Sequence, residues 1–505
     1  MPLSNSLIHK SSILPCFKTF VRRKSLIFNQ AFINGSFCDA ESKKQFDVLN
    51  PATGDVISSV PDMDVADVEK AVSLAHSAFK DWKNTTTKER GIILRKWYDL
   101  LVQNQEELAK IVSSEAGKPF KEALGEVAYG NSFIEWFAEE SRRINGELIP
   151  SPVKSKRIVL IKQPIGVVGL ITPWNFPHAM ITRKAGAALA AGCTCVVKPA
   201  EDTPLTAIAL AALAKDAGLP EGVLNVVTCD RRNAPAVGKL LCESPQTAGI
   251  SFTGSTAVGK ILYKQCASGV KRVALELGGN APFIVFNSAD IGKAVEGAIA
   301  CKFRNSGQTC VSANRIFVQD GIFTEFVAAL KSAIESNLKI GKTSDANIGP
   351  LINEAQMQKV SDLVNDAVSK GAKVLIGGKK AESHGSLFYE PTLITNVTSE
   401  MLCAKEEIFG PIAVCYPFKS ENEVIEAAND VKVGLAGYFY SNDVGQIWRV
   451  AEQLEVGMVG VNEGIISTAE AAFGGVKESG IGREGSHHGI DEFTDVKYIC
   501  FGNLN

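Results

Sequence analysis

Apolar residues recur at helical spacing in the first third of the chain. One such series consists of Val68, Val72, Ala75, Phe79 and Trp82. Residues three or four positions apart lie on the same face of a helix, so the series predicts an amphipathic helix. Asp64 and Asp67 stand where the N-cap and the first turn of that helix belong. Residues 92–112 predict a second amphipathic helix.

Short apolar runs bounded by turns follow, with alanine-rich helical segments between them. The runs that predict strands are 166–171, 193–197, 223–227, 249–252 and, after Glu276, 283–286. Residues 206–215 and 291–304 predict two of the helices. Buried strands that alternate with helices are typical of parallel, doubly wound sheets. We therefore expect two α/β domains in tandem, with extra strands at 157–161 and 496–501.

Composition and charge narrow the class of protein. Of the 505 residues, 45% are hydrophobic and 21% are charged, which excludes wholesale disorder. The 53 basic and 55 acidic residues give a net charge of −2, so the chain has no overall electrostatic footprint for nucleic acid. No apolar run reaches the roughly 18 residues that a membrane span needs. We expect a large soluble protein without nucleic-acid or membrane partners.

The N-terminal segment has the composition of a targeting sequence. Residues 1–38 contain no Asp or Glu, and their basic residues are Lys10, Lys18, Arg22, Arg23 and Lys24. A basic, hydroxylated segment that is poor in acid is typical of an organelle transit peptide. We predict that residues 1–28 are such a leader; a disordered basic tail is the alternative.

Cysteine and histidine usage argues against disulfide staples and against a dedicated metal site. The 12 cysteines form no regular framework, and a chain of this length does not need disulfides. The close pair Cys193 and Cys195 enters a β-branched run, so both are expected to be buried strand residues. The six histidines form no HExxH motif and no spaced Cys/His cluster, so we predict no metal.

Two glycine motifs resemble phosphate-binding loops. Residues 254–260 nearly match a P-loop, but Ile261 stands where magnesium requires Ser or Thr. A glycine turn at a helix start can still receive a pyrophosphate. Gly480, Gly482 and Gly485 match GxGxxG, yet too few residues follow for a βαβ unit. We interpret these three as loop glycines.

Three residues carry possible chemistry. Cys310 follows a predicted helix that ends near Gly307, where its thiol can be exposed and backbone N–H groups can favour the thiolate; a buried apolar role is the alternative. Glu276 lies between leucines, so it is either ion-paired or functional. Asn175 lies between two prolines, which hold its amide rigidly as a donor or simply shape a turn. Together they form a thiol nucleophile, a base and an oxyanion donor.

The wider motif set resembles the NAD(P)-dependent aldehyde dehydrogenase family. The matching segments are Pro173–Pro177 (PWNFP), Lys198–Glu201 (KPAE), Phe252–Ser255 (FTGS), Glu276–Gly279 (ELGG), Gly307–Cys310 (GQTC), Glu407–Pro411 (EIFGP) and Phe473–Lys477 (FGGVK). They stand in the family's order and spacing over almost the whole chain after the leader. The resemblance implies the aldehyde dehydrogenase-like fold, which has two doubly wound α/β domains and a small β oligomerisation arm.

The resemblance also implies a mechanism and domain limits. Cys310 would attack the aldehyde, Asn175 and the Cys310 N–H would hold the oxyanion, and Glu276 would activate the hydrolytic water. The implied segments are a dinucleotide-binding domain over 29–150 and 164–276, oligomerisation strands over 151–163 and 484–505, and a catalytic domain over 277–483. A homo-oligomer, a dimer or a tetramer, follows by the same analogy.

Cofactor and substrate roles carry over by motif. The implied cofactor-binding residues are Trp174, Lys198, Glu201, Gly254, Ser255, Gly259, Glu407 and Phe409. A carboxylate at Glu201 would accept from the ribose hydroxyls and repel a 2′-phosphate, which favours NAD. The implied substrate-binding residues are Arg183, Arg304 and Ser467, because guanidinium groups suit a distal carboxylate.

Within the family, the chain is most similar to members that oxidise succinate semialdehyde in the mitochondrial matrix. Another semialdehyde substrate, such as glutarate semialdehyde, is the alternative within this mechanism. A non-catalytic binding protein on the same fold and a cysteine hydrolase are the alternatives outside it; the hydrolase would need a histidine base.

Several relatives carry a second cysteine two positions after the nucleophile. Ser312 occupies that position here, so we predict no redox switch through that pair.

Overall fold

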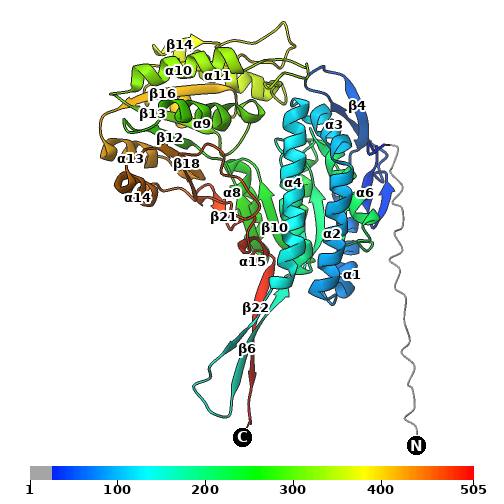
Figure 1. Ribbon diagram of the computed structural model, residues 1–505. Coiled ribbons are helices and arrows are strands. Elements are labelled where there is room, and N and C mark those ends of the chain that lie inside the picture. The colour runs from blue at the N-terminus through cyan, green and yellow to red at the C-terminus, as the bar shows by residue number, and fades with distance from the viewer. Residues whose placement is uncertain (1–24, 505) are drawn as a thin grey trace, which may run out of the picture.

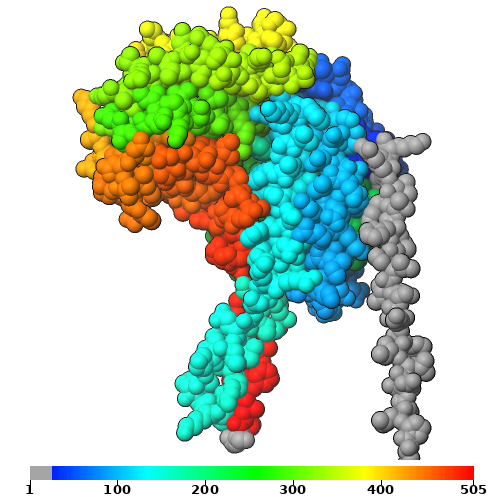
Figure 2. Space-filling view, in the orientation of Figure 1, coloured from blue at the N-terminus to red at the C-terminus, as the bar shows by residue number. Residues whose placement is uncertain are grey.

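The computed structural model describes residues 25–504, which form two α/β domains and a narrow β arm that projects from them (Figure 1). The space-filling view shows the arm standing clear of the body (Figure 2). Residues 1–24 of the predicted leader lie outside the described residues. Within the described part of the leader range, Leu26 is buried and the Phe28 ring stacks on Phe37 at 4.5 Å.

The first domain is built on an eight-stranded sheet of order β2-β1-β9-β8-β7-β10-β11-β21. Its strands are β1 (Ala31–Ile33), β2 (Ser36–Cys38), β7 (Val167–Ile171), β8 (Thr194–Lys198), β9 (Leu224–Val226), β10 (Thr247–Thr253), β11 (Arg272–Glu276) and β21 (Gly480–Ile481). The run from β9 to β11 is parallel. Strands β7 and β8 are buried throughout, as their unbroken apolar sequences predict.

Helices cover both faces of this sheet. They are α1 (Val65–Trp82), α2 (Thr87–Gln103), α3 (Gln105–Ala116), α4 (Phe120–Glu140), α5 (Ala179–Ala191), α6 (Pro204–Asp216), α7 (Ala234–Glu243) and α8 (Thr256–Cys266). Alternate residues of β7 pack on opposite faces of the sheet: Val168 and Leu170 belong to one core cluster, and Val167 and Ile171 belong to another. The period-two alternation of side chains across a strand explains this division.

The predicted start of α1 is confirmed, because Asp64 and Asp67 form a capping box there. The single helix predicted over 92–112 is wrong. The segment forms α2 and α3, which meet at Asn104. This residue has φ −110° and ψ 13°, and its side-chain Nδ2 donates to the Leu100 carbonyl at 2.8 Å. An asparagine side chain that competes for a helix carbonyl ends the first helix and lets the second begin at a new angle.

The second domain is also a sheet covered by helices, and its seven strands have the order β14-β15-β16-β13-β12-β18-β19. Its strands are β12 (Ala281–Val285), β13 (Ala313–Gln319), β14 (Lys373–Ile376), β15 (Thr392–Thr395), β16 (Ile412–Phe418), β18 (Ala436–Tyr440) and β19 (Met458–Val461). Its helices are α9 (Ile291–Phe303), α10 (Phe323–Asn337), α11 (Glu354–Ser369), α12 (Leu402–Lys405), α13 (Glu421–Asn429) and α14 (Val444–Gln453). Phe283 and Ile284 of β12 enter different core clusters, so this sheet is also covered on both faces.

The remaining strands form small sheets. The arm consists of β5 (Glu147–Ile149), β6 (Arg157–Pro164) and β22 (Thr494–Phe501), all antiparallel, and the short α15 (His488–Asp491) precedes β22. A hairpin pairs β3 (Gln45–Leu49) with β4 (Val56–Pro61), and β17 (Val433–Gly434) pairs with β20 (Val476–Lys477). The structure thus includes 147–149 in the arm, next to the predicted range 151–163.

The strand order of the first sheet marks a ligand crevice. Strand β7 has β8 and then β9 on one side, whereas β10 and then β11 lie on its other side. The order therefore reverses between β7 and β10. In doubly wound sheets, ligands bind at the carboxyl ends of the strands at such a switch point. Here those ends lead into Thr172–Asn175 and into Gly254.

Candidate active site

The loop that carries Cys310 begins with a left-handed turn. Helix α9 ends at Phe303, one residue before the end of the predicted range 291–304 and earlier than Gly307, and Asn305, Ser306 and Gly307 follow with φ of 52°, 55° and 74°. A Cβ atom at residue 307 would lie 2.1 Å from the Gly410 carbonyl oxygen, so only glycine fits there. The turn reverses the chain out of the helix and presents Cys310 beside the crevice.

Buried hydrogen bonds hold this turn in place. The Asn305 N–H donates to the Glu122 carboxylate at 3.1 Å, and the Asn305 side-chain Nδ2 donates to the Gln308 carbonyl at 3.1 Å. The Gln308 side chain accepts from the Ile352 N–H at 3.0 Å and donates to the Pro350 carbonyl at 3.2 Å. Because left-handed backbone is costly for residues other than glycine, these contacts are what keep the turn formed.

Asn175 lies directly against the Cys310 loop. Its side-chain Nδ2 donates to the Gln308 carbonyl at 3.1 Å, and its own carbonyl accepts from Asn305 Nδ2 at 3.0 Å and from Lys118 Nζ at 2.8 Å. Lys118 is ion-paired with Glu126, and both side chains are buried. The side-chain amide of Asn175 is thereby held against the carbonyl of Gln308, which precedes Cys310 by two positions in the chain. A rigidly held amide is what the flanking prolines predict.

Glu276 is the last residue of strand β11, and its side chain lies close enough to Cys310 to act on it electrostatically. It is 4% exposed, and its Oε2 atom makes no hydrogen bond. Burial, and secondarily the charge of Glu484, raises the pKa of Glu276 well above its ordinary value. The loop after it abuts the nucleophile, since a Cβ atom at Gly279 would lie 2.6 Å from the Cys310 carbonyl oxygen. The unpartnered oxygen argues for the functional rather than the ion-paired interpretation.

The predicted ease of forming the Cys310 thiolate is wrong. Burial, and then the nearby carboxylate of Glu407, raise the pKa of Cys310 to about 12, although Arg183 and Arg304 act in the opposite direction. The desolvation of a thiolate thus outweighs any help from backbone N–H groups. Cys310 is a partly exposed thiol that requires a base to take its proton, and Glu276, whose pKa is also raised, is close enough to influence it electrostatically.

Unpartnered polar groups and the N-terminus of a helix gather at the switch point of the first sheet. The Thr172 and Thr253 hydroxyls at the ends of β7 and β10 are buried without a hydrogen-bond partner. Gly254 follows β10, and Ser255 caps α8, so the helix presents its N-terminus to the crevice. Lys198 Nζ lies 3.9 Å from the Glu201 carboxylate at the end of β8. Unsatisfied donors and acceptors in this place are those that a polar ligand would satisfy.

Gly259 lies one turn into α8, and its predicted cofactor role has a packing alternative. A Cβ atom there would lie 2.4 Å from the Leu277 side chain. The close approach of α8 to the segment after Glu276 accounts for a glycine at this position.

The second domain contributes Glu407 and Phe409 to the crevice. Glu407 Oε1 accepts from the Gly279 N–H at 3.1 Å, and burial raises the pKa of Glu407 to about 7. Phe409 has a left-handed backbone with φ 56°, and its ring meets the Trp174 ring edge-on at 5.5 Å. Strained backbone at an aromatic residue is characteristic of ligand contacts. The two rings join the two domains where the crevice opens.

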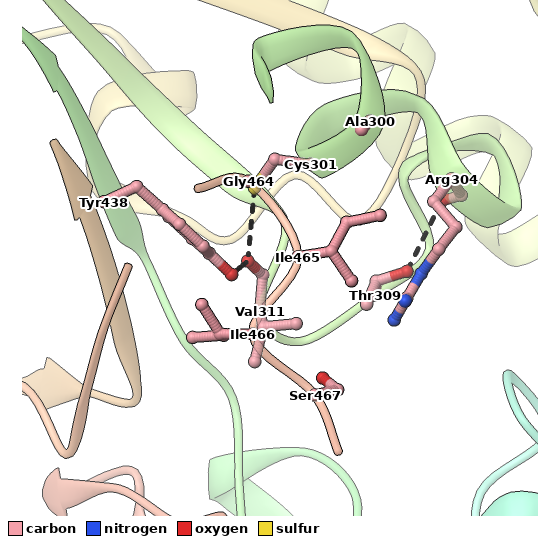
Figure 3. A pocket seen from close by; sticks show the side chains of 10 residues that line it. All are labelled: Ala300, Cys301, Arg304, Thr309, Val311, Tyr438, Gly464, Ile465, Ile466 and Ser467. Carbon is pink, nitrogen blue, oxygen red and sulfur yellow. Dashed lines mark hydrogen bonds between the residues drawn. The ribbon is translucent and has the colours of Figure 1, made fainter. Parts of the chain in front are cut away.

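A small hollow lies beside the Cys310 loop (Figure 3). Its lining residues are Ala300, Cys301, Arg304, Thr309, Val311, Tyr438, Gly464, Ile465, Ile466 and Ser467. Thr309 and Val311 flank Cys310, so the hollow adjoins the nucleophile. Among residues 25–504, the Arg304 guanidinium forms no ion pair; it lies over the Phe176 ring at 5.1 Å. Two predicted substrate residues, Arg304 and Ser467, therefore share one cavity.

Arg183, on α5, is 1% exposed and occupies a different environment. It is ion-paired with Glu484, and its guanidinium lies 4.0 Å from the centre of the Phe473 ring. One of its nitrogens lies 3.4 Å from the Tyr129 hydroxyl, which in turn bonds to Ser467. An arginine on a helix is ordinarily solvated or ion-paired, and here the ion pair is present. Tyr129 links this arginine to the hollow.

Several residues of the site escaped sequence reasoning. Glu484 pairs with both Arg183 and Lys184, and its charge acts on Glu276, yet it lies more than 200 residues away in the sequence. Lys302 is buried on α9 with no partner for its Nζ atom, and burial lowers its pKa to about 8. The signal for Lys302 is a charge between the apolar residues Cys301 and Phe303. Glu484 lies in a polar, glycine-rich stretch, where no local signal marks it.

Within residues 25–504, no three His, Cys, Asp or Glu side chains gather in a way that could hold a metal ion. The same part of the chain contains no helix that is both long enough and apolar enough to cross a membrane.

Comparisons with known proteins agree with this site. The sequence model of the aldehyde dehydrogenase family matches residues 37–499. The chain is 56% identical to the mitochondrial succinate-semialdehyde dehydrogenase of Mus musculus over 95% of this chain and 91% of that protein. It is 54% identical to the Oryza sativa protein of the same name, over 96% and 92%.

Solved structures give the same result. A succinate-semialdehyde dehydrogenase from Burkholderia pseudomallei superposes with a TM-score of 0.93 at 52% identity, over 95% of this chain and 99% of that one. An NADP-dependent enzyme of E. coli also reaches 0.93 at 52% identity, over 94% and 98%. With a thiol, a carboxylate and an amide converging beside a dinucleotide crevice, the chain belongs to the aldehyde dehydrogenase family.

Proposed function

We propose that this enzyme oxidises succinate semialdehyde to succinate with NAD. The observation that carries the substrate is the hollow beside Cys310, which holds the unpaired guanidinium of Arg304 together with Ser467. A partly exposed cation that forms no ion pair favours an anionic ligand, and a guanidinium binds a carboxylate in two parallel hydrogen bonds. An aldehyde with a carboxylate at its far end satisfies both Cys310 and Arg304. The names of the relatives support the same substrate.

The residues perform the chemistry in two stages. Glu276 takes the proton of the Cys310 thiol, and the sulfur attacks the aldehyde carbon to form a thiohemiacetal. The Asn175 amide and the Cys310 N–H donate to the resulting oxyanion. Bound NAD supplies the hydride acceptor. Glu276 passes its first proton to solvent and then takes a proton from the water that attacks the thioester; succinate leaves, and the Cys310 thiolate recovers that proton as the thiol is restored.

The raised pKa of Glu276 suits this exchange of protons. A carboxylate with a raised pKa accepts a proton more readily than an ordinary glutamate. The unbonded Oε2 of Glu276 leaves one oxygen available to take the proton. Lys118, Asn305 and Gln308 take no part in the proton transfer; they position the amide and the loop.

The NAD preference depends on Glu201. Its carboxylate, next to Lys198 at the end of β8, would accept from the adenosine ribose hydroxyls and repel a 2′-phosphate. The relatives do not decide the cofactor: the E. coli enzyme is NADP-dependent, whereas a more distant betaine aldehyde dehydrogenase of Staphylococcus aureus forms a complex with NAD. Trp174, Gly254, Ser255, Glu407 and Phe409 would hold the remainder of the dinucleotide.

We also propose that the enzyme is located in the mitochondrial matrix and assembles as a homo-oligomer. The acid-free N-terminal segment and the mitochondrial names of the relatives support the location. The arm supports assembly, because Leu148, Val496, Tyr498 and Phe501 are exposed on it. Apolar side chains gathered on a projecting sheet are typical of a surface that another subunit covers.

The experiment is an assay of the purified enzyme that follows reduced cofactor. Succinate semialdehyde, glutarate semialdehyde and butanal are compared with NAD and with NADP, and Cys310→Ala is the control. We expect the highest kcat/KM with succinate semialdehyde and NAD, and none in the control. A higher kcat/KM with butanal would refute the carboxylate site, and one with glutarate semialdehyde would move the assignment to that substrate.

A further inference from the structure

Glu122 lies in the first turn of α4, and its carboxylate bonds to another domain rather than to its own helix. A glutamate at this position ordinarily bonds back to the N–H of the N-cap residue. The N-cap residue of α4 is Pro119, which has no N–H to donate. The two oxygens of Glu122 instead accept from the Asn305 N–H of the second domain, at 3.1 and 3.2 Å. A side chain of the first domain therefore holds the backbone of the second.

The backbone at Asn305 is the part of the Cys310 loop that most needs to be held. Asn305 has φ 52° and ψ 37°, and Ser306 has φ 55° and ψ 33°. Both residues are buried. Consecutive left-handed residues are costly unless they are glycine, so such a turn persists only where surrounding contacts fix it. The hydrogen bond from Asn305 to Glu122 is one of these contacts.

Asn305 also joins the nucleophile loop to the oxyanion donor. Its side-chain Nδ2 donates to the Asn175 carbonyl at 3.0 Å and to the Gln308 carbonyl at 3.1 Å. Its own carbonyl accepts from the Gln308 N–H at 3.0 Å. A displacement of Asn305 therefore moves the segment that leads to Cys310 relative to Asn175.

The same side of α4 contacts both loops of the site. Lys118, Glu122 and Glu126 are spaced four positions apart, and the two glutamates lie on one face of the helix. Lys118 Nζ donates to the Asn175 carbonyl at 2.8 Å. Glu126 accepts from the His178 N–H at 2.8 Å. These two residues hold the loop of the first domain, and Glu122 holds the loop of the second.

We propose that Glu122 is a positioning residue for the aldehyde reaction, because its bond to the Asn305 N–H sets the place of the Cys310 sulfur relative to the Asn175 amide. The inference rests on the proposed function, since it takes Cys310 as the nucleophile. Glu122 touches no reacting atom. Without it, the turn relaxes and the sulfur shifts, and a shift of about 1 Å can lower a rate about 100-fold.

Arg304 offers an alternative role for the Glu122 carboxylate. Burial raises the pKa of Glu122, whereas the Asn305 N–H and then the charges of Lys118 and Arg304 lower it. An effect that acts through the charge of Arg304 would change the use of a carboxylated aldehyde and leave a neutral one unaffected. An effect that acts through the turn changes both equally.

Three substitutions of Glu122 in the full chain separate length from charge. Glu122→Gln keeps the length and an acceptor oxygen but removes the charge, Glu122→Asp keeps the charge but is one methylene shorter, and Glu122→Ala removes both. Initial rates are measured with succinate semialdehyde and with butanal. We expect the Asp and Ala variants to lower kcat about 10- to 100-fold on both aldehydes, with the KM for NAD unchanged. The Gln variant should stay within about fivefold of the unchanged enzyme, because a neutral hydrogen bond replaces a charged one.

Hydrogen–deuterium exchange of peptides that cover residues 303–312 measures the turn itself. Exchange should be faster in Glu122→Ala and Glu122→Asp than in the unchanged enzyme. Glu115→Ala is the matched control, because this buried carboxylate accepts from the Leu205 and Thr206 N–H groups at 2.7 and 2.9 Å, at the start of α6. It should lower the free energy of unfolding and leave exchange at 303–312 unchanged.

The exchange measurement needs no substrate, so its result is separate from any failure of the proposed function. Unchanged exchange at 303–312 in Glu122→Ala would overturn the proposal, as would faster exchange with an unchanged kcat. A loss confined to succinate semialdehyde, or a Gln variant as impaired as the Asp variant, would show that the charge acts through Arg304 and would also overturn it.

Discussion

Replacing Arg304 by Ala tests the substrate hollow most directly. The guanidinium forms no ion pair within residues 25–504, although its charge acts to lower the pKa of the nearby Glu122 carboxyl. Truncating one member of a hydrogen-bonded charge pair costs about 2–3 kcal/mol where the pair is partly solvated. At 1.4 kcal/mol for each tenfold, kcat/KM for succinate semialdehyde should fall about 30- to 150-fold. Butanal has no carboxylate to lose, so its value should change less than about threefold.

The assay compares both aldehydes in initial-rate measurements with the unchanged enzyme, Arg304→Ala and Arg304→Lys. Lysine keeps the charge but not the planar fork, so an intermediate loss is expected. Arg449→Ala is the matched control, because Arg449 forms an exposed ion pair with Glu421 on α13. Equal losses on the two aldehydes would show that Arg304 only supports the fold and would refute the reasoning.

Three further predictions follow from the site. Glu276 must be deprotonated to act as a base, so kcat should fall as the pH drops through its raised pKa, and Glu276→Gln should lower kcat about 10²- to 10⁴-fold in steady-state assays; an unchanged pH profile would contradict the role. Lys118→Met leaves Glu126 buried without its partner, so urea titration should show a loss of about 3–5 kcal/mol in unfolding free energy, and a loss below about 1 kcal/mol would argue against it. Glu201→Ser should raise the ratio of kcat/KM with NADP to that with NAD by about tenfold, equivalent to about 1.4 kcal/mol; a constant ratio would exclude Glu201 as the determinant.

Local patterns predicted the architecture well because they report local physics. The alternating strands and helices, the capping box at Asp64 and the buried run of β8 all depend on near neighbours in the chain. Asn104 shows the limit: periodicity detects a helical face, but one side chain that bonds back to Leu100 divides the helix in two.

The pKa shifts of the site residues could not be predicted from the sequence in the same way. The pKa of Cys310 depends on burial and on Glu407, which lies 97 positions later and approaches only after two domains have packed. The Glu484 charge that acts on Glu276 likewise arrives from the far end of the chain. Sequence motifs identified which residues meet; the sign and size of their mutual influence depend on the desolvation that packing creates.

The arm has a consequence for the order of biosynthesis. Strand β22 pairs with β6 along its whole length, from Thr494 with Pro164 to Phe501 with Arg157. The ribosome makes β22 long after β6, so the edge of β6 that pairs with β22 stays unpaired while more than three hundred later residues are synthesised. Pairing between such distant segments is slow and exposes the waiting strand to aggregation. A chain shortened before residue 494 would leave that edge of β6 permanently unpaired, because β22 is the strand that covers it.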